Sequence, residues 1–161
     1  MEDRFEKSLF GVVEGMLKCI EDKLLDETVL KTIEGLHQGE VVSVKRHVRL
    51  EGLECDAVAT LKLQRVKRTV GFELKIGDLA KVVEQAFARR HLFDYMYAVC
   101  QIELPLYDVL NWLNSLNLLK LIFDEGLGLI VLNPILVVSK AKWNKNRPNL
   151  TLEELLKSGN S

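Results

Sequence analysis

The order of strand-like and helix-like segments is the feature of this sequence that most constrains its fold. Alternating apolar positions and β-branched residues predict four strands, at residues 41–50, 53–63, 69–76 and 95–100. Only the turn Glu51-Gly52 and the polar residues 64–68 separate the first three, so we expect them to form an antiparallel meander. Between the third and fourth strands, apolar residues recur at helical spacing from Leu79 to about Leu92. A helix there supplies a parallel crossover, so the sequence predicts an α/β domain with a mixed sheet flanked by helices.

Further elements are predicted on both sides of this region. Apolar residues at three- and four-residue spacing favour a helix over 3–25, and Asp26 is a suitable N-cap for a second helix that runs to about Leu36. The downstream elements are a helix from Leu106 towards Phe123 with a candidate interruption at Asn114-Ser115, strands over 126–132 and 135–143, and a short helix opened by a Thr151–Glu154 capping box.

The length of 161 residues fits one domain, with N-terminal helices over 1–39, a core over 41–143 and a short C-terminal helix over 150–158. Apolar residues make up 48% and charged residues 28%, which is typical of a soluble globular protein. No apolar run approaches the roughly 20 residues that span a bilayer, and the first residues are charged rather than signal-like. We therefore expect a cytoplasmic location and no membrane partner.

Cysteine usage and charge exclude little more. Cys19, Cys55 and Cys100 lie far apart among apolar residues, which favours buried reduced thiols over a disulfide framework or a zinc site. The net charge of −1 argues neither for nor against a nucleic-acid partner. Basic residues gather between 41 and 75. They are interpreted either as a surface that binds phosphates or as a solvated strand edge, and the charge pattern alone favours the solvated edge.

Polar residues inside two apolar strands carry the candidate chemistry. Glu73 and Lys75 are two residues apart, so on a strand both point to one face while Phe72 and Leu74 point to the other. Asp56 is a lone acid in another apolar strand. Two carboxylates that converge from neighbouring strands suit Mg²⁺ or Mn²⁺, and a lysine beside them can orient a water and stabilise charge on a phosphate. The Glu-x-Lys tripeptide alone is more typical of a solvated edge with a weak ion pair.

Several features follow one another in a characteristic order along the chain. Asp56 is followed, after sixteen intervening residues, by Glu73-Leu74-Lys75 near the end of an apolar strand. Next come a helix that opens at Asp78 and carries Gln85, the short strand 95–100, and the glycine-containing strand Glu125–Leu132. In order and spacing these features resemble the core of the PD-(D/E)XK, or restriction-endonuclease-like, nuclease superfamily. Cys55 stands where the superfamily pattern has a proline, which makes the match less specific.

The resemblance implies roles for five positions in this chain. Asp56 and Glu73 would bind the metal, and the backbone carbonyl of Leu74 would supply a further ligand. Lys75 would position the attacking water or act in its deprotonation. Gln85 would lie at the edge of the cleft, near metal-bound water or phosphate.

Two further regions have functional and structural readings. Many members of the superfamily bring a glutamate from the N-terminal helix towards the metal. Glu6 lies beside the apolar stripe of that helix, whereas Glu14 falls almost opposite it, so Glu6 is the preferred candidate and a surface glutamate is the alternative. Arg89-Arg90-His91, after the Gln85 helix, can contact phosphate or complement the helix dipole.

By this resemblance the chain is expected to be a Mg²⁺-dependent nuclease, with Mn²⁺ as a substitute, that cuts DNA as an endonuclease through metal-activated water. DNA is the expected partner, and a homodimer is expected because a single cleft needs a two-fold partner to cut both strands. Two alternatives stay open: a nuclease-fold module that binds nucleic acid or protein without cutting, and a small α/β interaction protein that uses the Trp112 helix as a dimer face. The sequence does not choose between DNA and RNA.

Overall fold

The computed structural model describes residues 2–132, 134–147 and 151–158, with the side chains of residues 2–8, 10 and 158 excepted. The elements are α1 (Glu2–Asp22), α2 (Glu27–His37), β1 (Glu40–Leu50), β2 (Leu53–Leu63), β3 (Val66–Ile76), α3 (Leu79–Arg89), the 3₁₀ turn η1 (Arg90–Leu92), β4 (Tyr95–Gln101), α4 (Leu106–Ser115), α5 (Leu118–Asp124), β5 (Gly128–Leu132), β6 (Leu136–Ser139) and α6 (Leu152–Ser158). The protein is an α/β structure, as predicted.

The six strands form one mixed sheet in the order β1-β2-β3-β4-β5-β6. β1, β2 and β3 pair antiparallel, β3, β4 and β5 pair parallel, and β6 returns antiparallel to β5. The antiparallel meander and the parallel crossover through α3 are therefore confirmed. Because β3 has a strand on each side, its side chains lie inside the sheet rather than at an edge.

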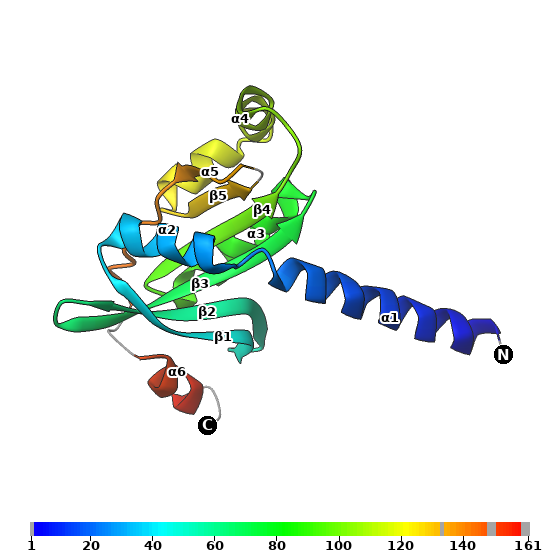
Figure 1. The fold of residues 1–161 in the computed structure, drawn as a ribbon, viewed down its shortest axis with the longest axis horizontal. Coiled ribbons are helices and arrows are strands. Elements are labelled where there is room, and N and C mark those ends of the chain that lie inside the picture. Colours follow the sequence, from blue (N-terminus) through cyan, green and yellow to red (C-terminus); the bar gives the residue numbers. More distant parts are fainter. Residues whose placement is uncertain (1, 133, 148–150, 159–161) are drawn as a thin grey trace.

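Helices cover both faces of the sheet (Figure 1). α2 lies on one face, where Ile33 joins Phe72 of β3 in a buried core. α3, α4 and α5 cover the other face, where Val83 and Leu113 join Met96 of β4. The two apolar faces bury the sheet from both sides, which leaves polar residues at its ends to form sites.

α1 extends away from the rest of the protein (Figure 1). Its apolar stripe lies in water, and six residues are 46–61% exposed: Leu9, Val12, Val13, Met16, Leu17 and Ile20. The prediction that Cys19 is buried is wrong because this helix extends from the core, whereas Cys55 and Cys100 are buried in the sheet. The chain turns after α1, and Asp26 begins α2 by accepting a hydrogen bond from the Val29 N–H at 3.0 Å, as predicted. Although α1 is long, none of the helices in the described residues is apolar enough over a sufficient length to cross a membrane.

The helix predicted from Leu106 towards Phe123 is two helices. Asn117 has a φ of 57°, in the left-handed region that asparagine tolerates, and it separates α4 from α5. Val109 and Leu113 of α4 are buried, and Trp112 packs half-buried against the same core. Leu106 and Leu116, at the two ends of this helix, stay about half exposed, so the structure covers the middle of the Trp112 face and leaves its ends in contact with solvent.

Two strand boundaries differ from the prediction by three residues or more. β3 begins at Val66, three residues early, because Val66 pairs with Leu63 across a two-residue turn and draws the polar connection into the hairpin. β6 ends at Ser139, four residues early. Beyond it the Lys142 N–H still donates to the Gly126 carbonyl at 2.9 Å, but side chains supply other contacts: the Ala141 N–H donates to the Tyr97 hydroxyl at 3.2 Å, and Arg90 Nη2 donates to the Lys142 carbonyl at 2.7 Å.

A histidine links α2 to β4. His37 Nε2 lies 2.7 Å from the Tyr97 hydroxyl, and its ring centroid lies 4.1 Å from that of Tyr95. Burial, with the charge of Lys140 as a second cause, lowers the pKa of His37 to about 4. The imidazole is therefore neutral at pH 7.

We expect the protein to lose stability as the pH falls from about 6.5 towards 4. The unfolded chain takes up a proton on His37 near pH 6.5, whereas the folded protein does so only near pH 4. The contribution of His37 to the free energy of unfolding is complete above about pH 6.5 and is lost as the pH falls from about 6.5 to about 4. Urea unfolding near pH 7 and near pH 5.5 should show a smaller loss for His37→Gln than for the wild type. The exposed His91→Gln control should behave as the wild type, and equal losses in all three proteins would contradict the prediction.

Candidate active site

β3 delivers two charged side chains to the face of the sheet that α3 covers. Glu73 and Lys75 alternate along the strand with Phe72 and Leu74, which are fully buried on the α2 side. Glu73 is only 2% exposed because strands lie on both sides of it. Lys75 is nearer the strand end and its side chain is 24% exposed.

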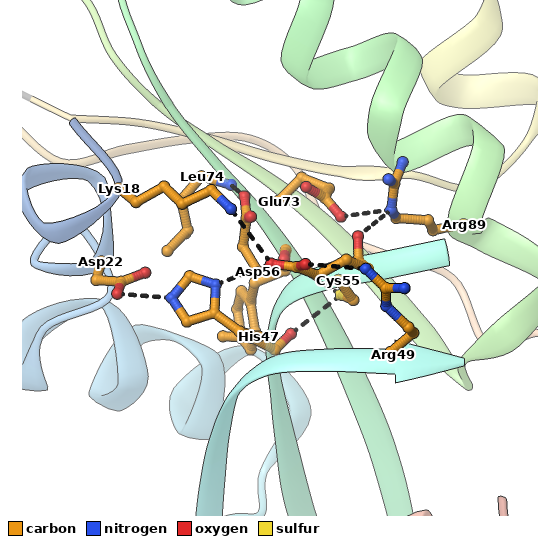
Figure 2. Close-up of polar contacts among 12 residues, drawn as sticks. Lys18, Asp22, His47, Arg49, Cys55, Asp56, Glu73, Leu74 and Arg89 are labelled. Atoms are coloured by element: carbon orange, nitrogen blue, oxygen red, sulfur yellow. Dashed lines mark hydrogen bonds and ion pairs between the residues drawn. The ribbon is translucent and has the colours of Figure 1, made fainter. Parts of the chain in front are cut away.

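Asp56 reaches the same place from β2 (Figure 2). The backbone pairing of β2 with β3 ends at Ala57 and Phe72. Just beyond, Asp56 Oδ2 accepts a hydrogen bond from the Leu74 N–H at 2.8 Å. The carboxylate takes the place of a strand partner for this amide, which fixes it beside Glu73.

The Glu73 carboxyl is buried with few partners. Arg89 Nε lies 2.9 Å from Glu73 Oε1 (Figure 2), but its N–H donates to the Glu54 carbonyl at 2.7 Å, and Oε1 is left without a hydrogen bond. Burial above all, then the charge of Asp56 and a hydrogen bond between the two carboxyls, raises the pKa of Glu73 to about 9. At neutral pH the pair therefore holds a proton unless a cation replaces it.

An acid of α1 forms part of the site wall. Glu21 Oε1 lies 3.8 Å from Lys75 Nζ, and the Glu21 side chain is 17% exposed. Burial raises the pKa of Glu21, the charge of Lys75 lowers it, and the charge of Asp56 raises it. Glu21 is thus electrostatically linked to the acid and the base of the sheet.

Four elements line one cavity of about 530 Å³ around these groups. The lining residues are Val13, Glu14, Leu17, Lys18 and Glu21 of α1, Glu54 and Asp56 of β2, Glu73 and Lys75 of β3, and Lys81, Gln85 and Arg89 of α3. Three of the lining acids are on the strands and two are on α1, and four cations come from α1, β3 and α3. This distribution suits a phosphate group that approaches a carboxylate-bound cation.

The cavity brings together four of the five side chains predicted for the site: Asp56, Glu73, Lys75 and Gln85. Leu74 joins them through its backbone N–H on Asp56. The side chain of Glu6 lies outside the described residues. With a rise of about 1.5 Å per residue, its backbone lies about 22 Å along α1 from that of Glu21.

Sequence reasoning missed two members of the site. Glu21 is seven residues after Glu14 and therefore lies on the same face of the helix. The predicted start of α2 soon after Glu21 was the sequence signal that the C-terminal end of α1 lies close to the sheet. Glu14, expected to face solvent, lines the cavity although it is exposed. Arg89, expected as a helix-end cation or a phosphate contact, lies against Glu73.

Polar contacts anchor the C-terminal end of α1 beside the site (Figure 2). His47 Nε2 lies 2.8 Å from Asp22 Oδ2, and its Nδ1 lies 3.2 Å from Glu54 Oε1. Arg46 donates to the backbone carbonyl of Asp22. The hydrogen bond with Asp22 is the main cause that raises the pKa of His47. A histidine between two acids thus holds the end of α1 that carries Glu21.

Asp56 and Glu73 fit a hard divalent cation. Carboxylate oxygens are the ligands that Mg²⁺ prefers, and Mg²⁺ is usually bound by one or two carboxylates while it keeps several waters. The buried Glu73 oxygen that lacks a hydrogen bond, and the raised pKa of the same group, both favour a cation in exchange for the proton. Among the described residues, no three His, Cys, Asp or Glu side chains form a ready-made metal cluster. The protein would therefore supply two carboxylates, and water the other ligands.

Comparisons with protein-family models, with curated proteins and with solved structures found no match for this chain. The chemistry of the site is accordingly inferred from its own residues and distances.

Glu73→Gln is expected to raise the thermal stability of the metal-free protein at neutral pH. The folded protein holds the Glu73 proton up to about pH 9, whereas the unfolded chain releases it near the ordinary value of 4.5. The stability carried by the protonated form is complete below about pH 4.5 and is lost as the pH rises through about 9. Calorimetry in EDTA from about pH 6 to 9 should show a melting temperature that falls with pH more steeply in the wild type than in Glu73→Gln. Glu84→Gln, on the exposed face of α3, is the control; parallel pH profiles for all three would refute this account of the site.

Proposed function

We propose that this protein is a metal-dependent nuclease with a restriction-endonuclease-like, PD-(D/E)XK core, which hydrolyses phosphodiester bonds in DNA as an endonuclease. One observation carries the proposal: the buried Glu73 carboxyl, with its raised pKa, lies beside Asp56 in a cavity that Lys75 also lines. Two carboxyls kept this close are costly unless they bind a proton or a cation. Strongly perturbed carboxyls in a cavity are more often functional groups than structural ones.

The arrangement of the strands supports the same proposal. The strands of Asp56 and Glu73 are antiparallel neighbours, and α3 leads from β3 to the parallel strand β4. This is the order of elements that the resemblance to the superfamily implies. Gln85 of α3 lines the cavity with the two acids, at the place expected for a residue at the cleft edge.

The residues of the chain have separate tasks in this proposal. When bound at the two carboxylates, Mg²⁺ or Mn²⁺ would supply Lewis-acid polarisation of the phosphodiester and activation of water. Lys75 orients the attacking water and offsets the negative charge that develops on the phosphate. Glu21, 3.8 Å from Lys75 Nζ, holds that lysine in position. Arg89 lowers the pKa of Glu73 against the effect of burial, which favours the ionised form that binds a cation.

A nuclease-fold module that binds nucleic acid or protein without cutting is the second candidate. It is favoured by Arg89, whose Nε lies 2.9 Å from Glu73 and places a positive charge beside the proposed metal ligand. It is also favoured because no cluster of three metal-ligating side chains exists in the part of the chain that the structure describes. Only the nuclease cleaves when a divalent metal is added, so one assay separates the two candidates.

The partner that covers α1 is proposed to be a second copy of the chain. Six apolar side chains of α1 are about half exposed, and a helix of this kind gains most of its stability from packing. Leu9, Val12 and Met16 follow the three- and four-residue spacing of a two-helix seam. The flanking residues Val13 and Ile20 carry no charge, so two such stripes can face each other without repulsion.

Metal binding at Asp56 and Glu73 is expected to release protons, and cleavage is expected to depend on Lys75. Calorimetric titration of Mg²⁺ and Mn²⁺ in two buffers of different ionisation enthalpy should show proton release, because the cation replaces the proton of Glu73. Asp56→Ala and Lys75→Ala should each lower metal-dependent cleavage of single-stranded, duplex and branched DNA by about 100-fold or more. Lys67→Ala, an exposed lysine elsewhere on β3, should cleave as the wild type.

Three results would decide against the nuclease. Metal binding with proton release but without cleavage of any DNA favours the binding module. Cleavage of RNA alone rejects DNA as the substrate. Equal activity in Asp56→Ala, Lys75→Ala and wild type, in proteins with the same circular dichroism, places the chemistry elsewhere.

The full chain is expected to sediment as a dimer at micromolar concentration. Met16→Glu puts a charge into the α1 stripe and should shift the species to a monomer with an unchanged sheet signal in circular dichroism. Val42→Glu, which charges another exposed apolar position, on β1, is the matched control and should remain dimeric. A wild type that stays monomeric at about 100 μM would rule out a dimer of useful affinity.

A further inference from the structure

A second and larger cavity lies at the C-terminal end of α3, outside the candidate active site. It measures about 800 Å³ and is lined by parts of three segments: 87–91 at the end of α3, 124–126 after α5, and 142–147 after β6. Phe87 of α3 and His91 of η1 line this cavity, whereas Gln85 and Arg89 of α3 line the active-site cavity. Because residues two apart point to opposite sides of a helix, the two cavities flank the same helix end.

An aromatic ring lines this cavity in a fixed position. Trp143 lies after β6 and is 43% exposed. The guanidinium carbon of Arg68 lies 4.0 Å from the centroid of the Trp143 ring, so a cation–π contact holds one face of the indole. Phe87, also 43% exposed, contributes a second ring. Exposed aromatic rings in a cavity are surfaces on which nucleobases stack.

Buried polar contacts hold the segment that carries Trp143. Arg147 Nη1 lies 2.9 Å from Asp94 Oδ2, and their side chains are 4% and 2% exposed. The backbone N–H of Asn144 donates to the Asp94 carbonyl at 2.9 Å. The residue before Trp143 is held as well, because Arg90 donates a hydrogen bond to the Lys142 carbonyl. A ligand would not have to order this wall, so less of its binding energy is lost to ordering.

Positive groups outnumber acids in the cavity lining. Asp124 and Glu125 are lined up against four cations, Arg90, Lys142, Lys145 and Arg147, and Lys142 lies next to the acids because its N–H donates to the Gly126 carbonyl at 2.9 Å. A polyanion is therefore attracted to the segment that carries Trp143. Phosphates beside the two lysines would bring their bases against the tryptophan.

We propose that this cavity binds unpaired nucleobases of a single-stranded nucleic acid, with one base stacked on Trp143 and the adjoining phosphates near Lys142 and Lys145. The inference deepens the proposed nuclease function and rests on it for the relation between the two cavities. A helix with its side chains is about 10–12 Å across, which corresponds to roughly three base steps of about 3.4 Å. A strand cut at the active site would pass Trp143 a few nucleotides away. The substrate class is therefore one with a single-stranded segment.

The fluorescence of Trp143 tests this proposal directly, because the chain has 2 tryptophans. In full-length Trp112→Phe, Trp143 is the remaining one. A short oligothymidylate is titrated at low salt in EDTA, so that no metal-dependent cleavage occurs. Stacking predicts saturable quenching that weakens with salt and that a blunt duplex of the same length does not produce.

Two variants measure the contribution of the cavity. Trp143→Ala and Lys145→Glu should each weaken binding of a labelled single strand, measured by anisotropy, by about tenfold. Lys145→Glu leaves the Arg68–Trp143 contact in place, so it reports even if Trp143→Ala does not fold. Phe123→Ala is the matched control, because this exposed ring of α5 is absent from both linings, and its affinity should not change.

Failure of this proposal is distinguishable from failure of the nuclease. Equal quenching by duplex and single strand, or unchanged affinity in both cavity variants, overturns the base-binding site. Asp56→Ala should abolish cleavage and leave the quenching intact. Quenching without cleavage by the wild type retains the base-binding site and rejects the nuclease, whereas metal-dependent cleavage without quenching does the reverse.

Discussion

A carboxyl group inside a sheet is tolerated only where its neighbours offset the loss of water. Glu73 is in this position, and its burial is answered from two other elements: Arg89 of α3 favours the charged form, whereas a hydrogen bond with Asp56 of β2 favours the protonated form. The side chain is therefore stable only when strand, hairpin and helix have all come together. Assembly of the fold and assembly of the site are the same event for this residue.

α3 connects packing to chemistry because its two sides differ. Leu79, Val82, Val83 and Ala86 are buried against the sheet and orient the helix. With that face fixed, the helical repeat sends Gln85 and Arg89 to the cavity beside Glu73 and sends Phe87 to the cavity beside Trp143. One amphipathic helix thus determines which residues enter each cavity, and a change in its apolar face would disturb both.

Local patterns were enough to predict most of the fold. Asp26 and Asp78 accept hydrogen bonds from Val29 and Lys81 as N-caps do, and the two-residue period placed Glu73 and Lys75 on one face.

Long-range contacts account for what the sequence did not predict. Glu21 enters the site where His47 and Arg46 bind Asp22 at the end of α1, and the chain beyond β6 is bound by the side chains of Arg90 and Tyr97. These contacts also couple α1 to the site: Glu21 holds Lys75, so a phosphate that draws this lysine towards itself competes with a contact that keeps α1 in place. Coupling between two binding events is reciprocal. A second copy bound to the exposed stripe of α1 would therefore change the affinity of the active-site cavity for its ligand. The ligand would change the affinity of α1 for the second copy by the same factor.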